Sequence, residues 1–390
     1  MKKFLAMLIA ATMVLTLAVP VLASSDESSA TSASEERELI PSDDPEVRLS
    51  FASFNPSGNA HEPMIQYALT EAYYRSGGTI KTDFYPGGTL CGQADMVDGI
   101  KNRVTDMGMF QVSDNASAMP ELAMAEKPGV YFSSSPSISS AVTEYIQTYQ
   151  PAEMEGLHFL CCTYGTKGCI CSNAGPIHTP EDLKGQTIRA TGLNADAVSS
   201  LGAVPSDLAF ADCYEALRTG VVDGIMTIRG GLIQTKLYEV VKYGIDYPLY
   251  NTGAIIAMNE EAWESLTPNQ QEALQSAFDD AYEISWKNFF DDMYKTADAF
   301  HLYEDLEEYY YPTDEEIALF SDAVSYIAED YAKTIENGDE ILQRWLDLAA
   351  KYNEEYPAKK DTDDDFYIAL DPFTGERLIS VSGYAFSLPY

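Results

Sequence analysis

The sequence has few basic residues. Only 24 Lys and Arg stand against 61 Asp and Glu, which gives a formal net charge of -37. A nucleic-acid binder needs a basic surface to neutralise phosphates, so this composition argues against a nucleic-acid partner. The charge does not identify a ligand, because salt screens charges beyond about 10 Å and the local groups of a site decide binding.

Motifs for catalysis are also missing. The four histidines are far apart, and none lies in H-E-x-x-H or a similar spacing. The chain has no G-x-S-x-G, P-loop or G-x-G-x-x-G. Cys91, in "YPGGTLCGQ", is a candidate nucleophile without an evident histidine partner. We therefore expect no enzymatic activity, no cofactor and no metal site; a secreted hydrolase is the least favoured alternative.

The sequence has one long apolar run, at its N-terminus. Lys2-Lys3, the run 4–19 and Val21-Leu22-Ala23 have the charged, apolar and small-residue parts of a secretory signal, which we assign to residues 1–23. The run is shorter than the roughly 20 residues that span a bilayer. Residues 24–46 are Ser-rich and acidic, which predicts a disordered tether. We expect export to the periplasm or the extracytoplasmic cell surface.

The six cysteines allow two interpretations. In an exported protein they predict one or two disulfides, but buried free thiols explain them equally well. Four of them are expected on two neighbouring strand-like runs, in a C-C-x6-C-x-C spacing that is not typical of a metal site. The six are Cys91, Cys161, Cys162, Cys169, Cys171 and Cys213.

From Val47 onward, short apolar runs alternate with helical patterns, which is typical of an α/β fold. Strands are expected at 47–54 and 79–88. Between them, a helix over 61–78 is predicted from apolar residues at i+4 spacing and from the two glycines at its end. Helix start signals occur later at Thr179, Thr267 and Thr313.

The start signal at Thr267 opens the longest predicted helix. It runs through Phe300 and is long enough to cross two lobes. One face of this helix is expected to hold Ala273, Ala277, Ala281 and Ile284.

An internal repeat predicts two lobes. Residues 94–109 ("ADMVDGIKNRVTDMGM") align without gaps on 211–226 ("ADCYEALRTGVVDGIM"), with five identities. Both segments combine a helix with a strand after it. Two lobes built from similar units imply a ligand site between them, where strand ends converge.

Several motifs in order resemble one protein family. They are "DFYPGGTLCGQADMVDGI", "TDMGMF", "TPEDLKGQTIRATG", "LGAVPSDLAFADCYEALRTGVVDG" and "KLYEVVKYG". Together they resemble the dicarboxylate-binding type of solute-binding proteins of tripartite ATP-independent periplasmic (TRAP) transporters, over roughly residues 48–350. The resemblance implies a two-lobed α/β fold with a long hinge-spanning helix. It also implies capture of a small organic acid and its delivery to the small and large membrane subunits of an ion-gradient-driven transporter. We expect the protein to be a monomer.

The same resemblance implies a set of site residues. Arg189 matches the arginine that pairs the ligand carboxylate, and Phe210 matches the aromatic that packs on the ligand. The further candidates for ligand binding are Lys167, Tyr164, Thr227, Arg229, Gln111 and Cys91.

Each main candidate has a structural alternative. Arg189 could instead pair with Asp182 or Asp207, and Arg229 could form a salt bridge within its own helix. Lys167 could be solvated, and Phe210 could belong to the core. For Thr227, ligand binding and a structural role are equally open.

The boundaries expected are 47–163 plus 254–293 for lobe one, 164–253 plus 294–355 for lobe two, and 356–390 for a C-terminal extension. A binding protein of an ATP-driven importer and a ligand-presenting partner of a sensor are the alternative functions.

Overall fold

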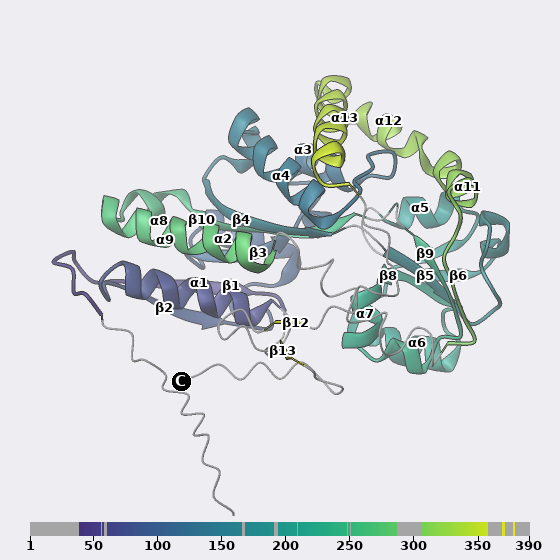
Figure 1. The fold of residues 1–390 in the computed structure, drawn as a ribbon, viewed down its shortest axis with the longest axis horizontal. Helices are drawn as coiled ribbons and strands as arrows, with labels where there is room; N and C mark the ends of the chain where they lie inside the picture. The colour runs from purple at the N-terminus through teal and green to yellow at the C-terminus, as the bar shows by residue number, and fades with distance from the viewer. Residues whose placement is uncertain are drawn as a thin grey trace, which may run out of the picture. The chain divides into compact units, whose positions relative to one another are not determined.

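The computed structural model describes residues 39–357 except 56, 58–60, 166–167, 191–193, 209, 248, 250 and 287–305, together with 369–370 and 377–378. All of these residues belong to one compact unit that begins at Leu39. The fold is α/β with two separate sheets, each covered by helices (Figure 1). The predicted signal and most of the predicted tether and extension lie outside the described residues.

Sheet one has five strands in the order β2-β1-β3-β10-β4. β1 runs parallel to β2 and β3, whereas β10 runs antiparallel to β3 and β4. The strand bounds are β1 Val47–Ser53, β2 Ile80–Tyr85, β3 Met107–Gln111, β4 Leu157–Gly165 and β10 Thr252–Asn259.

Sheet two has six strands in the order β11-β9-β5-β8-β6-β7. β6 lies parallel between β7 and β8, and β5 lies antiparallel between β8 and β9. The bounds are β5 Gly168–Ser172, β6 Thr187–Arg189, β7 Val204–Ser206, β8 Gly224–Ile228, β9 Tyr243–Tyr247 and β11 Glu308–Tyr310.

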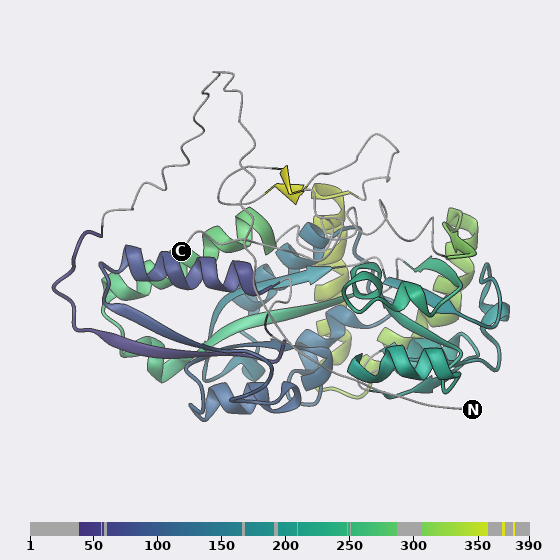
Figure 2. The ribbon, with the colours of Figure 1, turned by 90° about the horizontal axis from the view of Figure 1, so that it is seen from below.

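Helices cover both faces of sheet one because its strands bury apolar side chains on both sides. Helices α1 (Glu62–Arg75) and α9 (Pro268–Ala281) lie side by side on one face (Figures 1 and 2). There the rings of Phe51 and Phe278 stack at 6.4 Å. The other face carries α2 (Met96–Lys101), α3 (Pro120–Ala123), α4 (Ser135–Tyr149) and α13 (Gly338–Glu355).

Sheet two also has a core on each face. One core joins Ile188 and Ile245 to α5 (Asn194–Ser200) and α11 (Asp314–Val324). The other joins Ile225 to α6 (Cys213–Thr219) and α7 (Arg229–Gln234). The remaining helices and strands are α8 Glu260–Glu264, α12 Tyr326–Ala332, β12 Ala369–Leu370 and β13 Arg377–Leu378.

The internal repeat is confirmed in three dimensions. α2 and β3 start 117 residues before α6 and β8, and the two strands lie inside different sheets. The aspartate before each strand has the same role. Asp106 accepts a hydrogen bond from the backbone N–H of Ser50 at 2.8 Å, and Asp223 accepts one from Thr187 at 2.7 Å. Each carboxylate therefore ties its strand to the parallel neighbour.

The predicted helix starts agree with the observed caps, with one difference. The hydroxyls of Thr267 and Thr313 accept hydrogen bonds from Gln270 and Glu316 and begin α9 and α11. Thr179 also forms a capping box, but it begins only a single 3-10 turn, Pro180–Leu183. The buried face predicted for the first helix is confirmed, since Met64, Ala68 and Ala72 are inaccessible or nearly so.

The long helix differs from its prediction. α9 ends at Ala281 and continues as a π-turn, Tyr282–Trp286. Ala273, Ala277 and Ala281 are buried as expected, whereas Ile284 is 48% exposed because the π-turn changes the helical phase. The segment 287–305, which would carry the helix across the lobes, lies outside the described residues.

The C-terminal helices divide between the two sheets, which differs from the expectation that residues 294–355 belong to lobe two. α11 packs on sheet two through Phe320 and Val324. α13 instead belongs to the core of sheet one, where Trp345 stacks on Tyr145 at 4.2 Å and donates to the carbonyl of Glu121 at 2.8 Å. The apolar stripe of α13 complements α4, and the sequence pattern alone does not specify this partner.

All six cysteines are buried, and no disulfide joins them. Cys161 and Cys162 face opposite cores of sheet one, and Cys169 and Cys171 lie on one face of sheet two. The two runs are neighbours in sequence but belong to different sheets, so the structure favours the interpretation as buried thiols.

Candidate functional site

Arg189 lies at the end of β6, between the two strands that run parallel to it. Its neighbour Ile188 is fully buried, and Arg189 is half-buried. The Nε atom donates to the carbonyl oxygen of Leu208 at 3.0 Å. The guanidinium lies 5.3 Å from the ring centroid of Phe210, within the range of a cation–π interaction. These contacts hold the guanidinium and leave its two terminal nitrogens without a hydrogen bond to a described residue.

Within the described part of the chain, Arg189 has no ion pair with a carboxylate. Asp182, one of the alternative partners, accepts hydrogen bonds from the backbone N–H groups of His178 and Thr179 and closes a capping box. Asp207, the other, is exposed and forms no ion pair among the described residues. The guanidinium is therefore held in place without being neutralised.

Thr227 and Phe210 meet at a glycine of α7. A Cβ atom on Gly231 would lie 2.9 Å from Thr227 Oγ1 and 3.3 Å from Phe210 Cζ. Thr227 is buried and Phe210 is half-buried. Thr227 thus lies beside the aromatic ring that contacts Arg189, on the face of sheet two that α7 covers.

The contacts of Arg229 are typical of a residue with a structural role. Its side chain is fully buried, and its Nε atom lies 3.3 Å from Asp246 Oδ1 on β9. Its Nη1 atom donates to the hydroxyl of Tyr311 at 3.3 Å. This ion pair favours the structural alternative, although the partner is on a strand of the sheet and not in the arginine's own helix.

Gln111 lies at the end of β3 in a polar group of lobe one. Gln93 Nε2 donates both to Gln111 Oε1 at 2.9 Å and to a carboxylate oxygen of Asp114. Burial raises the pKa of Asp114, while its hydrogen bond to Gln93 and the charge of Arg189 lower it. Asp114 and Arg189, from opposite lobes, therefore lie within electrostatic range of each other.

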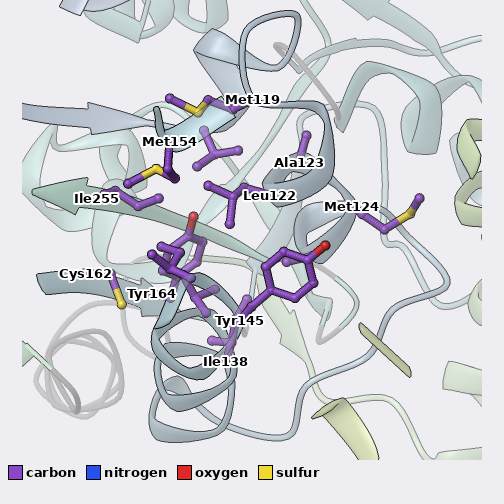
Figure 3. Packing of buried hydrophobic residues seen from close by; sticks show 14 of the residues in the cluster. Met119, Leu122, Ala123, Met124, Ile138, Tyr145, Met154, Cys162, Tyr164 and Ile255 are labelled. Carbon is purple, nitrogen blue, oxygen red and sulfur yellow. The ribbon is translucent and has the colours of Figure 1, made fainter. Parts of the chain in front are cut away.

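Tyr164 is fully buried at the end of β4, inside the core of sheet one (Figure 3). Its hydroxyl has no hydrogen-bond partner in the described part of the chain. The carboxyl of Glu126, 2% exposed, likewise has no partner for either oxygen among these residues. Burial first, and then the charge of Asp114, raises the pKa of Glu126 well above its usual value. The Tyr164 hydroxyl is near enough to oppose this rise without forming a hydrogen bond of good geometry.

The other candidates contribute less. Cys91 is 7% exposed, and its sulfur occupies the space beside Gly99, where a Cβ atom would lie 2.4 Å away. Burial, together with the smaller effect of the charge of Asp95, raises the pKa of its thiol, which opposes nucleophilic reactivity. Lys167 lies outside the described residues.

Glu126 and Asp114 were not predicted from the sequence. Glu126 had one available signal, because it is the one carboxylate inside the largely apolar run "LAMAEKPGVYF". A charge in such a run is buried or functional, and its isolation distinguishes it from the many surface acids. Asp114 carries no comparable signal.

Neither a metal cluster nor a membrane span occurs among the described residues. No group of three or more His, Cys, Asp or Glu side chains in this part of the chain is arranged to hold a metal ion. None of the helices described is both long and apolar enough to span a bilayer.

Comparison with known proteins identifies the family. Residues 53–334 match the family model of the bacterial extracellular solute-binding proteins, family 7 (DctP). The C4-dicarboxylate-binding protein DctB of Bacillus subtilis is 25% identical over 246 residues, which are 59% of this chain and 68% of the relative. The 2,3-diketo-L-gulonate-binding periplasmic protein YiaO of Escherichia coli is 25% identical over 275 residues, 69% of this chain and 82% of the relative.

Solved structures agree with this match. A TRAP periplasmic solute-binding protein from Desulfovibrio salexigens has a TM-score of 0.70 and 25% identity, covering 81% of this chain and 98% of the other. A marine metagenome TRAP solute-binding protein specific for aromatic acids has a TM-score of 0.71 and 23% identity, covering 80% and 100%; this second likeness shows the fold. Because the family model matches well over half of the sequence, the chain belongs to the family 7 (DctP) bacterial extracellular solute-binding proteins, the binding components of TRAP transporters.

Proposed function

We propose that this protein captures a small organic acid through Arg189 and delivers it to the small and large membrane subunits of an ion-gradient-driven TRAP transporter. One observation carries the proposal. Arg189 is oriented by Leu208 and Phe210, yet within the described residues no carboxylate neutralises it. A guanidinium held in this way pairs both oxygens of a carboxylate through its terminal nitrogens.

Ligands of the solved relatives support the acid class. Benzoate is bound to a TRAP solute-binding protein of Rhodoferax ferrireducens, β-D-galacturonate to one of Sulfitobacter, and pyroglutamic acid to DctP7 of Bordetella pertussis. These molecules differ in size and polarity but share one carboxylate. The common element matches the group that Arg189 would bind, and the remainder of each ligand would be selected by other side chains.

The site residues divide into groups under this proposal. Arg189 supplies the charge, Phe210 packs on the ligand, and Thr227 lies beside Phe210. Gln111 contributes from lobe one and Tyr164 from the end of β4. Lys167 stays a proposed second cation. Cys91 would support its own loop, 85–93. Arg229 would contribute indirectly, because its ion pair with Asp246 stabilises sheet two next to the site.

The protein would act as an exported monomer without enzymatic activity. Cleavage near Ala23 would release it outside the cytoplasm, where it would shuttle between free ligand and the membrane subunits. A measured mass near that of one chain by light scattering would agree with this part of the proposal.

A thermal-unfolding screen tests the ligand class. The purified, ligand-stripped chain beginning at Ser24 is heated with carboxylates, diacids, sugar acids, amino acids, neutral sugars and amines. A ligand at about a hundred times its dissociation constant adds roughly 2.7 kcal/mol of stability, which shifts the transition visibly. We expect shifts from compounds that carry a carboxylate and from none that lack one.

An arginine variant tests the residue. Arg189→Ala should weaken binding of the acid about ten- to a hundredfold, because it removes a charge-assisted hydrogen-bonded pair. Arg218→Ala is the matched control, since Arg218 is an exposed arginine paired with Glu215 on α6. Equal affinity in Arg189→Ala and Arg218→Ala, or shifts only from neutral or cationic compounds, would remove Arg189 from the site.

A further inference from the structure

Three buried polar atoms of lobe one have no partner among the described residues. They are both carboxyl oxygens of Glu126 and the hydroxyl oxygen of Tyr164. Both side chains are at least nine-tenths buried, at 2% and 0% exposure. An unsatisfied buried polar group costs about 1–3 kcal/mol, so two adjacent ones indicate a function that compensates the cost.

The Glu126 segment is held firmly in place. Asn251, just before β10, donates through Nδ2 to the carbonyls of Ala125 at 3.0 Å and Val130 at 2.9 Å. These two bonds fix the backbone on both sides of Glu126. A buried carboxyl on a clamped segment is pre-organised, as a binding group must be.

Glu126 is connected to Arg189 through Asp114. The charge of Asp114 acts on Glu126, and the charge of Arg189 acts on Asp114. These electrostatic interactions link Arg189 of lobe two, through Asp114, to Glu126 and Tyr164 of lobe one. A ligand between Arg189 and Tyr164 would therefore have a protein cation at one end and acidic protein groups at the other.

We propose that the ligand of this site is a zwitterion, whose carboxylate pairs with Arg189 and whose protonated amino group is bound by Glu126, with Tyr164 and Asp114 beside it. The inference rests on the proposed function, because it extends the same site. An ammonium group offers three donors and a positive charge, which match two unsatisfied carboxyl oxygens better than a second carboxylate does. A dianion would place its far carboxylate against Glu126 and Asp114, where like charges repel.

The charged groups around Glu126 agree with this polarity. Lys127 is the neighbouring cation, and its Nζ atom lies 3.2 Å from Asp196 Oδ2 and 4.4 Å from the ring centroid of Tyr331. Asp196 partly compensates Lys127, whose charge has the smallest effect on the pKa of Glu126, after burial, Asp114 and Tyr164. Burial raises the pKa of Glu126 and a bound ammonium would lower it, so binding of the amino group should be accompanied by proton release.

Matched ligand sets test the proposal. Each set contains an α-amino acid, its deaminated acid and its α-hydroxy acid: L-alanine, propionate and L-lactate; L-glutamate, glutarate and 2-hydroxyglutarate; L-phenylalanine, 3-phenylpropionate and phenyllactate. Affinities are measured by calorimetry on the protein beginning at Ser24. In at least one set the amino member should bind at least about tenfold more tightly than its deaminated acid, the size expected of a charge-assisted hydrogen bond.

Two variants of the Glu126 region and a measurement of proton release show which groups cause the preference for the amino member. Glu126→Gln should bring the affinities of the amino member and its deaminated acid close to each other, whereas Arg189→Ala should weaken both. Tyr164→Phe keeps the ring and should reduce the preference in part. Calorimetry of the unmodified protein in buffers of different ionisation enthalpy should show proton release with the amino member only, and this readout needs no variant that must fold.

The outcomes separate the two proposals. If acids bind through Arg189 but the deaminated or hydroxy member binds as tightly as the amino member, the zwitterion inference is wrong and the proposed function stands. If the preference survives in Glu126→Gln with no proton release in the unmodified protein, Glu126 does not bind the amino group, and the inference is again wrong. If no acid of any kind binds, the proposed function itself fails.

Discussion

The guanidinium of Arg189 lies 5.3 Å from the ring centroid of Phe210, and both belong to lobe two. The contact orients the arginine from one side while the carbonyl of Leu208 holds its Nε atom. A cation on a flexible stem would lose much of its freedom on binding. Here the side chain is already placed, so less conformational entropy is lost when a carboxylate arrives.

Replacing this arginine by lysine should not restore binding. Arg189→Lys keeps the charge but loses the planar fork, the bond to Leu208 and much of the contact with Phe210. We expect affinity for an acid to fall roughly tenfold, measured by calorimetry. Phe210→Leu should give a smaller loss of the same sign, since about 0.5–1 kcal/mol is typical of a half-exposed cation–π pair. Wild-type affinity in the lysine variant would show that the fork is not used.

A methyl group added at Gly231 of α7 should push against Thr227 and Phe210, the site residues that α7 covers. In Gly231→Ala the added Cβ would meet Thr227 Oγ1 at 2.9 Å and Phe210 Cζ at 3.3 Å. Overpacking of this kind costs about 1–3 kcal/mol, which thermal unfolding would detect. The matched control is Gly175→Ala, where a Cβ meets nothing within 4 Å.

The companion change at Thr227 identifies the cause. If the clash with the hydroxyl dominates, Thr227→Ala should recover part of the stability lost in Gly231→Ala, beyond the sum of the two single effects. Additive losses would instead assign the cost to Phe210 or to the helix backbone.

Stability should depend on pH through Glu153. Burial raises the pKa of this carboxyl to about 7, even though it accepts hydrogen bonds from the backbone N–H groups of Glu121 and Leu122 at 2.8 Å each. The folded pKa lies above the unfolded value of 4.5, so the folded state binds the proton more tightly. This stabilisation is present below pH 4.5 and is lost as the pH rises through about 7.

The size of this pH dependence is set by the difference between the folded and unfolded pKa values of Glu153. A difference of this kind corresponds to about 2–3 kcal/mol in the free energy of unfolding between pH 4 and pH 8. Glu153→Gln should flatten that part of the pH profile, whereas Glu155→Gln, at an exposed neighbour, should not. Parallel profiles for wild type and Glu153→Gln would show that Glu153 does not titrate in this range.

The six thiols should be free and protected. All six cysteines are buried in the structure, and burial raises the pKa of Cys162 to about 12. A thiol reagent should therefore react slowly with the native protein at pH 8 and with six thiols per chain in denaturant. Fewer than six under denaturing, non-reducing conditions would indicate a disulfide.

Much of the fold was predictable because it is recorded in local patterns. The i+4 spacing of Met64, Ala68 and Ala72 identified α1. The repeat placed α2 with β3 and α6 with β8, and even the equivalent aspartates Asp106 and Asp223 are paired by the alignment. Periodicity and capping act over a few residues, so one sequence is enough to detect them.

The features that could not be predicted depend on distant partners. The pairing of Arg229 with Asp246 needs β8 and β9 to flank β5, which no local pattern specifies. The same holds for α13, whose apolar stripe fits either lobe. Glu126 is the clearest case, because a single acid in an apolar run is recognisable, but its relation to Tyr164 and Asp114 exists only in the folded chain.

Two of the connections between the sheets leave and enter at paired strand ends. Gly165, at the end of β4, pairs with Thr252 at the start of β10, and Gly168, at the start of β5, pairs with Tyr247 at the end of β9. Each strand pair therefore sets the ends of both connections side by side, in sheet one and in sheet two. Neighbouring crossings of this kind are typical of a hinge, so a ligand that draws Arg189 toward Asp114 would rotate one sheet toward the other about these paired ends.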